Sequence, residues 1–190
     1  MTRLVLIKHS LPEIEPNVPS PDWLLSDVGR ARCAWLAEQM RLQGVRRMFT
    51  SDEPKAAETG QLTARALGIE APPRVDLHEN DRTNLGFLPS NELRARLHEF
   101  FDFPNRLVMG RETAEAAVKR FSNAIDHALK ETRGATTSIV THGTVITLFV
   151  SQHNPHVPRF PMWDVLGLPS FVVLEGDKFE FDGKVHNHPG

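Results

Sequence analysis

Apolar residues recur along this chain in two alternating patterns: short continuous runs, and longer stripes in which every third or fourth residue is apolar. The run at residues 4–7 is bounded by Arg3 and Lys8, and such a run is typical of a strand buried on both faces of a parallel sheet. A helical stripe follows the proline-rich loop 11–21. Its members are Cys33, Leu36, Ala37 and Met40, with Ser26 as the expected cap and Gly44 as the expected end.

The same alternation continues through the rest of the chain. The patterns predict strands at 46–50, 75–77 and 137–141, and helices at 55–67, 114–128 and 144–151. Two further apolar runs, at 171–174 and 179–181, predict a terminal hairpin or meander. Strands that alternate with helices indicate an α/β fold, here a three-layer α/β/α domain with a mostly parallel central sheet.

The length of 190 residues fits one domain with room for an insertion. Residues 80–110 are the least regular part of the chain, with one helix expected within 91–101 and a loop on each side of it. We therefore expect a single domain over residues 1–190 that carries a small cap insertion at about 80–110.

Charge and cysteine content exclude several classes of protein. The 22 Lys and Arg residues nearly balance the 24 Asp and Glu residues, which disfavours nucleic acid or an acidic membrane surface as a partner. Cys33 is the only cysteine, and the apolar start of the chain is too short for a signal peptide or a membrane span. These features indicate a cytoplasmic protein. The sequence lacks the GxxxxGK[ST] and GxGxxG motifs of P-loop and dinucleotide-binding proteins.

Two histidines follow predicted strands directly, His9 after the first and His142 after the strand at 137–141. Ligands of open α/β sheets bind beyond the carboxyl ends of the strands, so these rings are candidates for one site. Lys8 adjoins His9, Lys55 begins a helix, and Gly143 begins another helix whose free N–H groups favour anions. Either lysine alone is more typical of a solvated surface. Together, these residues predict a pocket for a tetrahedral dianion.

Five segments, in order along the chain, resemble the histidine phosphatase superfamily, also called the phosphoglycerate-mutase-like family. Residues 4–10 (LVLIKHS) are similar to the family's opening LVLVRHG, and residues 25–32 (LSDVGRAR) to its LTxxGRxQA. Residues 50–59 (TSDEPKAAET) resemble SSPLxRAxQT, residues 77–79 (LHE) resemble LxE, and residues 139–146 (IVTHGTVI) resemble VVSHGGVI. The match extends over nearly the whole chain, and it implies the phosphoglycerate-mutase-like fold.

The resemblance also implies roles for three residues. His9 would be the nucleophile that becomes a phosphohistidine, His142 would bind the phosphoryl oxygens, and Glu79 would give a proton to the leaving oxygen. Asp81, two residues further along the same loop, is a rival for the acid role. His9 must attack as the neutral imidazole, which nearby cations favour, and its other ring nitrogen should be held by a carbonyl or carboxylate.

Three residues depart from the family pattern. Lys8 and Lys55 stand where the family has arginine, and Ser10 stands where it has glycine. Lysine keeps the charge but lacks the planar fork that binds two phosphate oxygens, a loss of about 1.5–3 kcal/mol at each site. The Ser10 hydroxyl is a further candidate to bind the phosphate, or its side chain narrows the pocket.

The sequence therefore predicts a phosphatase that hydrolyses a phosphomonoester through a phosphohistidine on His9. The alternative is a catalytically impaired protein of the same fold that binds phosphate or a phosphorylated ligand. A phosphoglycerate-type mutase fits less well, because the cap is short and the family's asparagine after the first histidine is absent. The expected partner is a small phosphorylated substrate or a phosphoprotein. The predicted reaction requires no cofactor or metal. His186 and His188 lack the further ligands that a metal site needs. The sequence leaves the oligomeric state open, a homodimer included.

Overall fold

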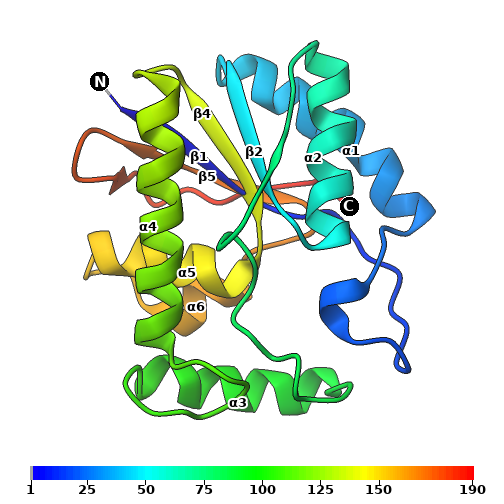
Figure 1. The fold of residues 1–190 in the computed structure, drawn as a ribbon, viewed down its shortest axis with the longest axis vertical. Coiled ribbons are helices and arrows are strands. Elements are labelled where there is room, and N and C mark those ends of the chain that lie inside the picture. The colour runs from blue at the N-terminus through cyan, green and yellow to red at the C-terminus, as the bar shows by residue number, and fades with distance from the viewer. Residues whose placement is uncertain (1) are drawn as a thin grey trace.

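A seven-stranded sheet forms the centre of the computed structural model, which describes residues 2–190 (Figure 1). The strand order is β3-β2-β4-β1-β5-β6, and β7 also pairs with β5. Strands β1 to β4 are mutually parallel, whereas β5 runs antiparallel to β1 and begins the terminal meander. The strands are β1 (Arg3–Lys8), β2 (Arg47–Ser51), β3 (Pro73–Arg74), β4 (Thr137–Thr141), β5 (Ser170–Glu175), β6 (Glu180–Phe181) and β7 (His186–Asn187).

Helices cover both faces of the sheet, which confirms the three-layer α/β/α expectation (Figure 1). Successive residues of β1 point to opposite faces. Val5 and Ile7 pack in one core cluster with α1 (Asp27–Leu42) and α2 (Pro54–Leu67). Leu4 and Leu6 pack in a second cluster with α4 (Ala114–Thr132) and α5 (Gly143–His153). Burial on both faces explains why β1 is a continuous apolar run.

Residues 80–110 contain one helix, α3 (Ser90–Asp102), as the pattern predicts. Its buried residues Leu97, Phe100 and Phe101 join Met109, the start of α4 and Leu148 in a third apolar cluster. Figure 1 shows α3 lying across the lower end of α4, and α3 also contacts α6 (Arg159–Asp164). The segment is therefore held by an apolar cluster that it shares with α4 and α5.

The capping signals are confirmed. Ser26 accepts a hydrogen bond from the Gly29 N–H at the start of α1, and Gly44 follows the last turn with a positive φ of 69°. Gly68 ends α2 in the left-handed conformation, and Pro54 lies in the first turn. A three-residue 3-10 helix (Ser20–Asp22) lies within the proline-rich loop.

One expected strand needs correction, and two further elements are absent from the expectations. The strand predicted at 75–77 lies two residues earlier, at Pro73–Arg74, because Asp76 has a positive φ of 67° and turns the chain out of the sheet. Helix α6 has no apolar stripe long enough to reveal it. The histidine tail is ordered: β7 pairs with β5, and the His186 ring stacks on Phe171 at 4.5 Å between centroids.

Candidate active site

The two histidines meet at the carboxyl end of the sheet. His9 directly follows β1 and His142 directly follows β4, and these strands are adjacent and parallel, with Lys8 paired to Thr141. The ring centroids are 5.3 Å apart with an interplanar angle of 62°. The register of these two parallel strands thus brings together two residues that are far apart in the chain, as the sequence predicts.

His9 presents one ring nitrogen to the site and keeps the other occupied. Its Nδ1 lies 2.7 Å from the carbonyl oxygen of Ser10, so Nδ1–H donates and Nε2 carries the free lone pair. Burial lowers the pKa of His9 well below its usual value, and the neighbouring His142 and Lys55 lower it further. The neutral imidazole that a nucleophile needs is therefore the resting form.

A cavity of about 390 Å³ opens in front of these rings. Its polar part consists of side chains from the ends of β1, β2 and β4 and from the loop after β3. They are Lys8, His9, Glu53, Lys55, Glu79, Asn80, Arg82 and His142, together with Gly143 and Thr144 at the start of α5. A cluster of both cations and carboxylates surrounds the candidate nucleophile.

Lys8 reaches into the cavity from β1. Its ammonium group donates a hydrogen bond to the carbonyl oxygen of Leu166 at 2.7 Å. Burial lowers the pKa of Lys8 to about 8, against the opposing charge of Glu79. Its stem packs on Gly143, where an added Cβ would lie 3.3 Å from Lys8 Cε. Lys8 is therefore charged at neutral pH but close to titration.

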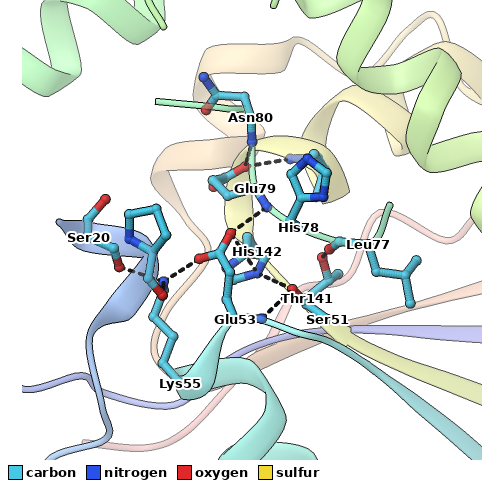
Figure 2. Close-up of polar contacts among 12 residues, drawn as sticks. Ser20, Ser51, Glu53, Lys55, Leu77, His78, Glu79, Asn80, Thr141 and His142 are labelled. Atoms are coloured by element: carbon cyan, nitrogen blue, oxygen red, sulfur yellow. Dashed lines mark hydrogen bonds and ion pairs between the residues drawn. The ribbon is translucent and has the colours of Figure 1, made fainter. Parts of the chain in front are cut away.

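Lys55 is bound to a carboxylate that the sequence analysis did not single out. Its ammonium group donates to the Ser20 carbonyl at 2.7 Å and forms an ion pair with Glu53 Oε2 (Figure 2). Both side chains are almost fully buried, at 7% and 10% exposed. One feature of the sequence could have indicated this residue: Glu53 stands where the SSPLxRAxQT pattern has leucine. A charge at a normally apolar position can mark a site residue.

The other oxygen of Glu53 faces two further elements of the site. Oε1 accepts the backbone N–H of Glu79 at 2.9 Å and lies 3.5 Å from Nε2 of His142 (Figure 2). One carboxylate thus ties together helix α2, the loop after β3 and the end of β4. Its negative charge lies among the groups that would bind an anion.

His142 also has one ring nitrogen with a hydrogen-bond partner and one without. Nε2 lies 2.9 Å from the hydroxyl of Ser51, whereas Nδ1 is buried and has no hydrogen-bond partner among the described residues. Burial lowers the pKa of His142 well below its usual value, with Lys55 and Arg82 adding to the effect. When the Ser51 hydroxyl donates to Nε2, the proton of the neutral ring lies on Nδ1, which is then a free donor.

Glu79 lies at the amino end of α5. Its Oε2 accepts the N–H of Thr144 at 3.1 Å, and its Oε1 accepts the N–H groups of Val145 at 3.3 Å and Asn80 at 3.0 Å. These bonds satisfy orphan donors of a helix whose first residue is Gly143. The carboxylate is thereby fixed at the wall of the cavity.

Arg120 holds the loop that carries Glu79, a role that no pattern in the sequence indicates. From α4 its guanidinium donates to the carbonyl oxygens of Asp76 at 2.8 Å, His78 at 3.1 Å and Glu79 at 3.1 Å. It also forms an ion pair with Glu112 at 2.6 Å. Such a network fixes a loop that lacks regular structure.

Two predicted residues lie outside the cavity wall. The Ser10 hydroxyl donates to the Gly29 carbonyl at 2.7 Å, towards α1 and away from the cavity. The Asp81 carboxylate accepts the hydroxyl and N–H of Thr83 instead. Burial raises the pKa of Asp81, but these hydrogen bonds together with the charges of Arg111 and His78 outweigh it and leave the pKa below its usual value. Neither residue lines the cavity, whereas Glu79 does.

Two further features concern metals and membranes. Within residues 2–190, no three His, Cys, Asp or Glu side chains are grouped so that they could hold a metal ion. None of the helices in that range combines the length and apolar character that a membrane crossing requires.

The fold and this cluster define a known class of protein. The family model for the histidine phosphatase superfamily (branch 1) matches residues 4–188, and the chain belongs to that superfamily. This confirms the family resemblance, and with it the phosphoglycerate-mutase-like fold.

Particular relatives are distant in sequence. A probable phosphoglycerate mutase GpmB of Yersinia enterocolitica is 24% identical over 177 residues, which cover 84% of this chain and 79% of that protein. A mycobacterial glucosyl-3-phosphoglycerate phosphatase superposes with a TM-score of 0.77 at 17% identity, covering 93% of this chain and 91% of the other. A phosphoserine phosphatase of Entamoeba histolytica, in complex with 3-phosphoglyceric acid, gives 0.78 at 16% identity, covering 100% and 98%. These structural likenesses establish the fold.

Proposed function

We propose that this protein is a phosphomonoester hydrolase that works through a phosphohistidine on His9. One observation carries the proposal: Nε2 of His9 is unprotonated and open to the cavity, while Nδ1 is held by the Ser10 carbonyl. A nucleophile needs this combination of a free lone pair and a fixed ring. Membership of the superfamily and the phosphatase activities named for two structural neighbours support it.

In the first step, His9 Nε2 attacks phosphorus and the bond from phosphorus to the alcohol oxygen breaks. The transferring group carries negative charge on its equatorial oxygens, so catalysis rests on alignment and fixed positive charge. The groups that we propose supply it are Lys8, Lys55, His142 and the first N–H of α5 at Gly143, all of which line the cavity. Ser10 does not belong to this set, because its hydroxyl faces α1.

Glu79 is the proposed acid. It lines the cavity, unlike Asp81. Glu79 then gives its proton to the departing alkoxide. In the second step a water attacks the phosphohistidine, Glu79 takes a proton from that water, and inorganic phosphate leaves while His9 is restored.

The direct test is hydrolysis of 4-nitrophenyl phosphate by the purified protein and by His9→Ala. We expect turnover by the native protein and its loss in the variant, together with an acid-labile phosphoryl group on the native protein after rapid quenching. His98→Ala is a matched control, because this histidine is exposed on α3. Equal turnover by native protein and His9→Ala would refute the proposal.

A second function is favoured by the contacts of the two lysines. Lys8 donates to Leu166 and Lys55 is paired with Glu53, so both cations are already bound to the protein. A site of this kind can bind a phosphorylated ligand without turning it over. Binding of phosphate, measured by calorimetry, with no hydrolysis would identify the protein as such a binding module. For both functions we propose one domain over 1–190, with 80–110 as its cap, acting in the cytoplasm.

A further inference from the structure

The cavity extends well beyond the phosphate centre, and the nature of this extension identifies a substrate class. We propose that the alcohol part of the phosphomonoester is an uncharged apolar group of the size of an aromatic ring or a six-carbon chain. The inference rests on the proposed function and makes it more specific. It is carried by the walls of the cavity in front of His9.

Apolar side chains form the walls away from the phosphate centre. The proline-rich loop contributes Trp23 and Leu11, the segment before α3 contributes Leu85 and Phe87, and α3 itself contributes Leu93 and Leu97. Trp163 of α6 closes the cavity beside Gly143. These residues come from three separate stretches of the chain but line the same space. An alcohol bound through its phosphate must lie against them.

Charged groups are confined to the other end. Lys8 and Lys55 adjoin the nucleophile, and Arg82 lies 3.9 Å from Glu79. Among the described residues that line the cavity, no further lysine or arginine is present. A carboxylate or a second phosphate on the substrate would therefore lose its hydration against an apolar wall, at a cost of several kcal/mol. This differs from the 3-phosphoglyceric acid bound by the phosphoserine phosphatase neighbour.

Two of the aromatic rings that line the cavity lie close to each other. Trp23 and Phe87 have their centroids 6.4 Å apart, and they link the proline-rich loop to the segment before α3. The indole N–H of Trp23 donates to the carbonyls of Val18 at 3.0 Å and Glu15 at 3.1 Å, so its donor is satisfied by the protein. The ring consequently offers an apolar surface to a ligand. Phe87 is 44% exposed and so remains available for contact.

Substrates that share a primary alcohol as leaving group provide the test, because their intrinsic reactivities are similar. We expect kcat/KM for hexyl phosphate and 2-phenylethyl phosphate to exceed that for 3-phosphoglycerate and phosphoserine by about a hundredfold. The first two gain apolar contacts, whereas the last two must desolvate a charge. Trp23→Ala and Phe87→Ala should each lower the value for 2-phenylethyl phosphate about tenfold or more. Inhibition by inorganic phosphate, which reports the phosphate centre, should not change in either variant.

Controls separate this inference from the proposed function. Phe103→Ala removes an exposed ring outside the cavity and should leave the preference unchanged. Phe87→Arg introduces a cation where none exists and should raise kcat/KM for 3-phosphoglycerate. A native preference for 3-phosphoglycerate or phosphoserine would overturn the inference and leave the hydrolase standing. Hydrolysis of 4-nitrophenyl phosphate but of none of the four esters would overturn the inference alone, whereas failure to hydrolyse all five would overturn the hydrolase itself.

Discussion

The carboxylate of Glu53 and the ammonium group of Lys55 form a buried ion pair inside the candidate active site. The two residues are separated by one proline, and the same carboxylate also lies close to His142. The cation expected to bind phosphate is thus paired with a protein anion when the site is empty. An entering dianion must therefore compete with Glu53 for Lys55.

Replacing Glu53 by glutamine should therefore strengthen phosphate binding. Glu53→Gln keeps the size of the side chain and removes its charge, so we expect the Kd for inorganic phosphate to fall about ten- to a hundredfold, the equivalent of one charged hydrogen bond. The unliganded variant should be less stable by about 3 kcal/mol, because Lys55 loses its buried partner. Calorimetry and urea unfolding measure the two effects.

Glu58→Gln is the matched control on the same helix. Glu58 pairs with Arg30 at 2.6 Å on the surface, where such pairs contribute about 0–1 kcal/mol, and it does not line the cavity. Phosphate binding should be unchanged in this variant. If Glu53→Gln binds phosphate no more tightly than Glu58→Gln does, Glu53 does not oppose the anion.

Lys8 should set the alkaline limit of activity. Its pKa of about 8 means that the free protein loses this positive charge as the pH rises through 8, so kcat/KM should fall above that pH. Arginine stays charged at these pH values. In Lys8→Arg the fall should therefore move beyond pH 9, as measured with 4-nitrophenyl phosphate. An alkaline limb at the same pH in both proteins would assign it to another group.

The two buried histidines should make the fold sensitive to mild acid. Burial lowers the pKa of His9 and His142, whereas in the unfolded chain both titrate near 6.5. Below pH 6.5 the unfolded state binds more protons than the folded state, so stability falls with falling pH. Between pH 6.5 and 5.5 we expect a loss of about 1 kcal/mol from each histidine.

Urea unfolding of His142→Gln at the two pH values tests this expectation. The variant should lose about 1 kcal/mol less than the native protein over this interval, whereas His98→Gln, at an exposed position on α3, should lose as much as the native protein. Equal losses in all three proteins would show that His142 does not contribute.

Gly29 should be intolerant of any side chain. A Cβ at this position would lie 2.0 Å from the carbonyl oxygen of Leu11, which is backbone and cannot move freely. Gly29→Ala should destabilise the protein by about 3 kcal/mol and loosen the loop behind His9. The neighbouring Val28→Ala, at a position 54% exposed, should change stability by less than about 0.5 kcal/mol. Thermal unfolding of the two variants distinguishes a backbone clash from general sensitivity of the helix.

The layers of the fold could be predicted because buried strands and helices each have a characteristic spacing of apolar residues in the sequence. Strand β1 has apolar residues on both of its faces, and α4 has a stripe at helical spacing, so both patterns are unambiguous. Strand β3 has only two residues, and its end depends on the positive φ of Asp76. Tail strand β7 is fixed by contacts of His186 with Phe171, which no local pattern records.

The parts of the candidate site that could be predicted are the residues that directly follow the ends of strands. His9 and His142 come directly after buried strands, so the parallel arrangement brings them together. Glu53 and Arg120 were not found, because each acts through tertiary contacts with the loop at 76–79. The orientation of the Ser10 hydroxyl was not predictable either, since it depends on the approach of α1.

The strand order has a consequence for how the protein is made. Strand β4 lies between β1 and β2, although it follows both by many residues in the chain. A nascent polypeptide that has not yet reached residue 141 therefore has no central strand to join its first two. His9 and Lys55 can meet only after residue 141 has been synthesised, so emerging intermediates expose two apolar strand edges that invite association with other chains.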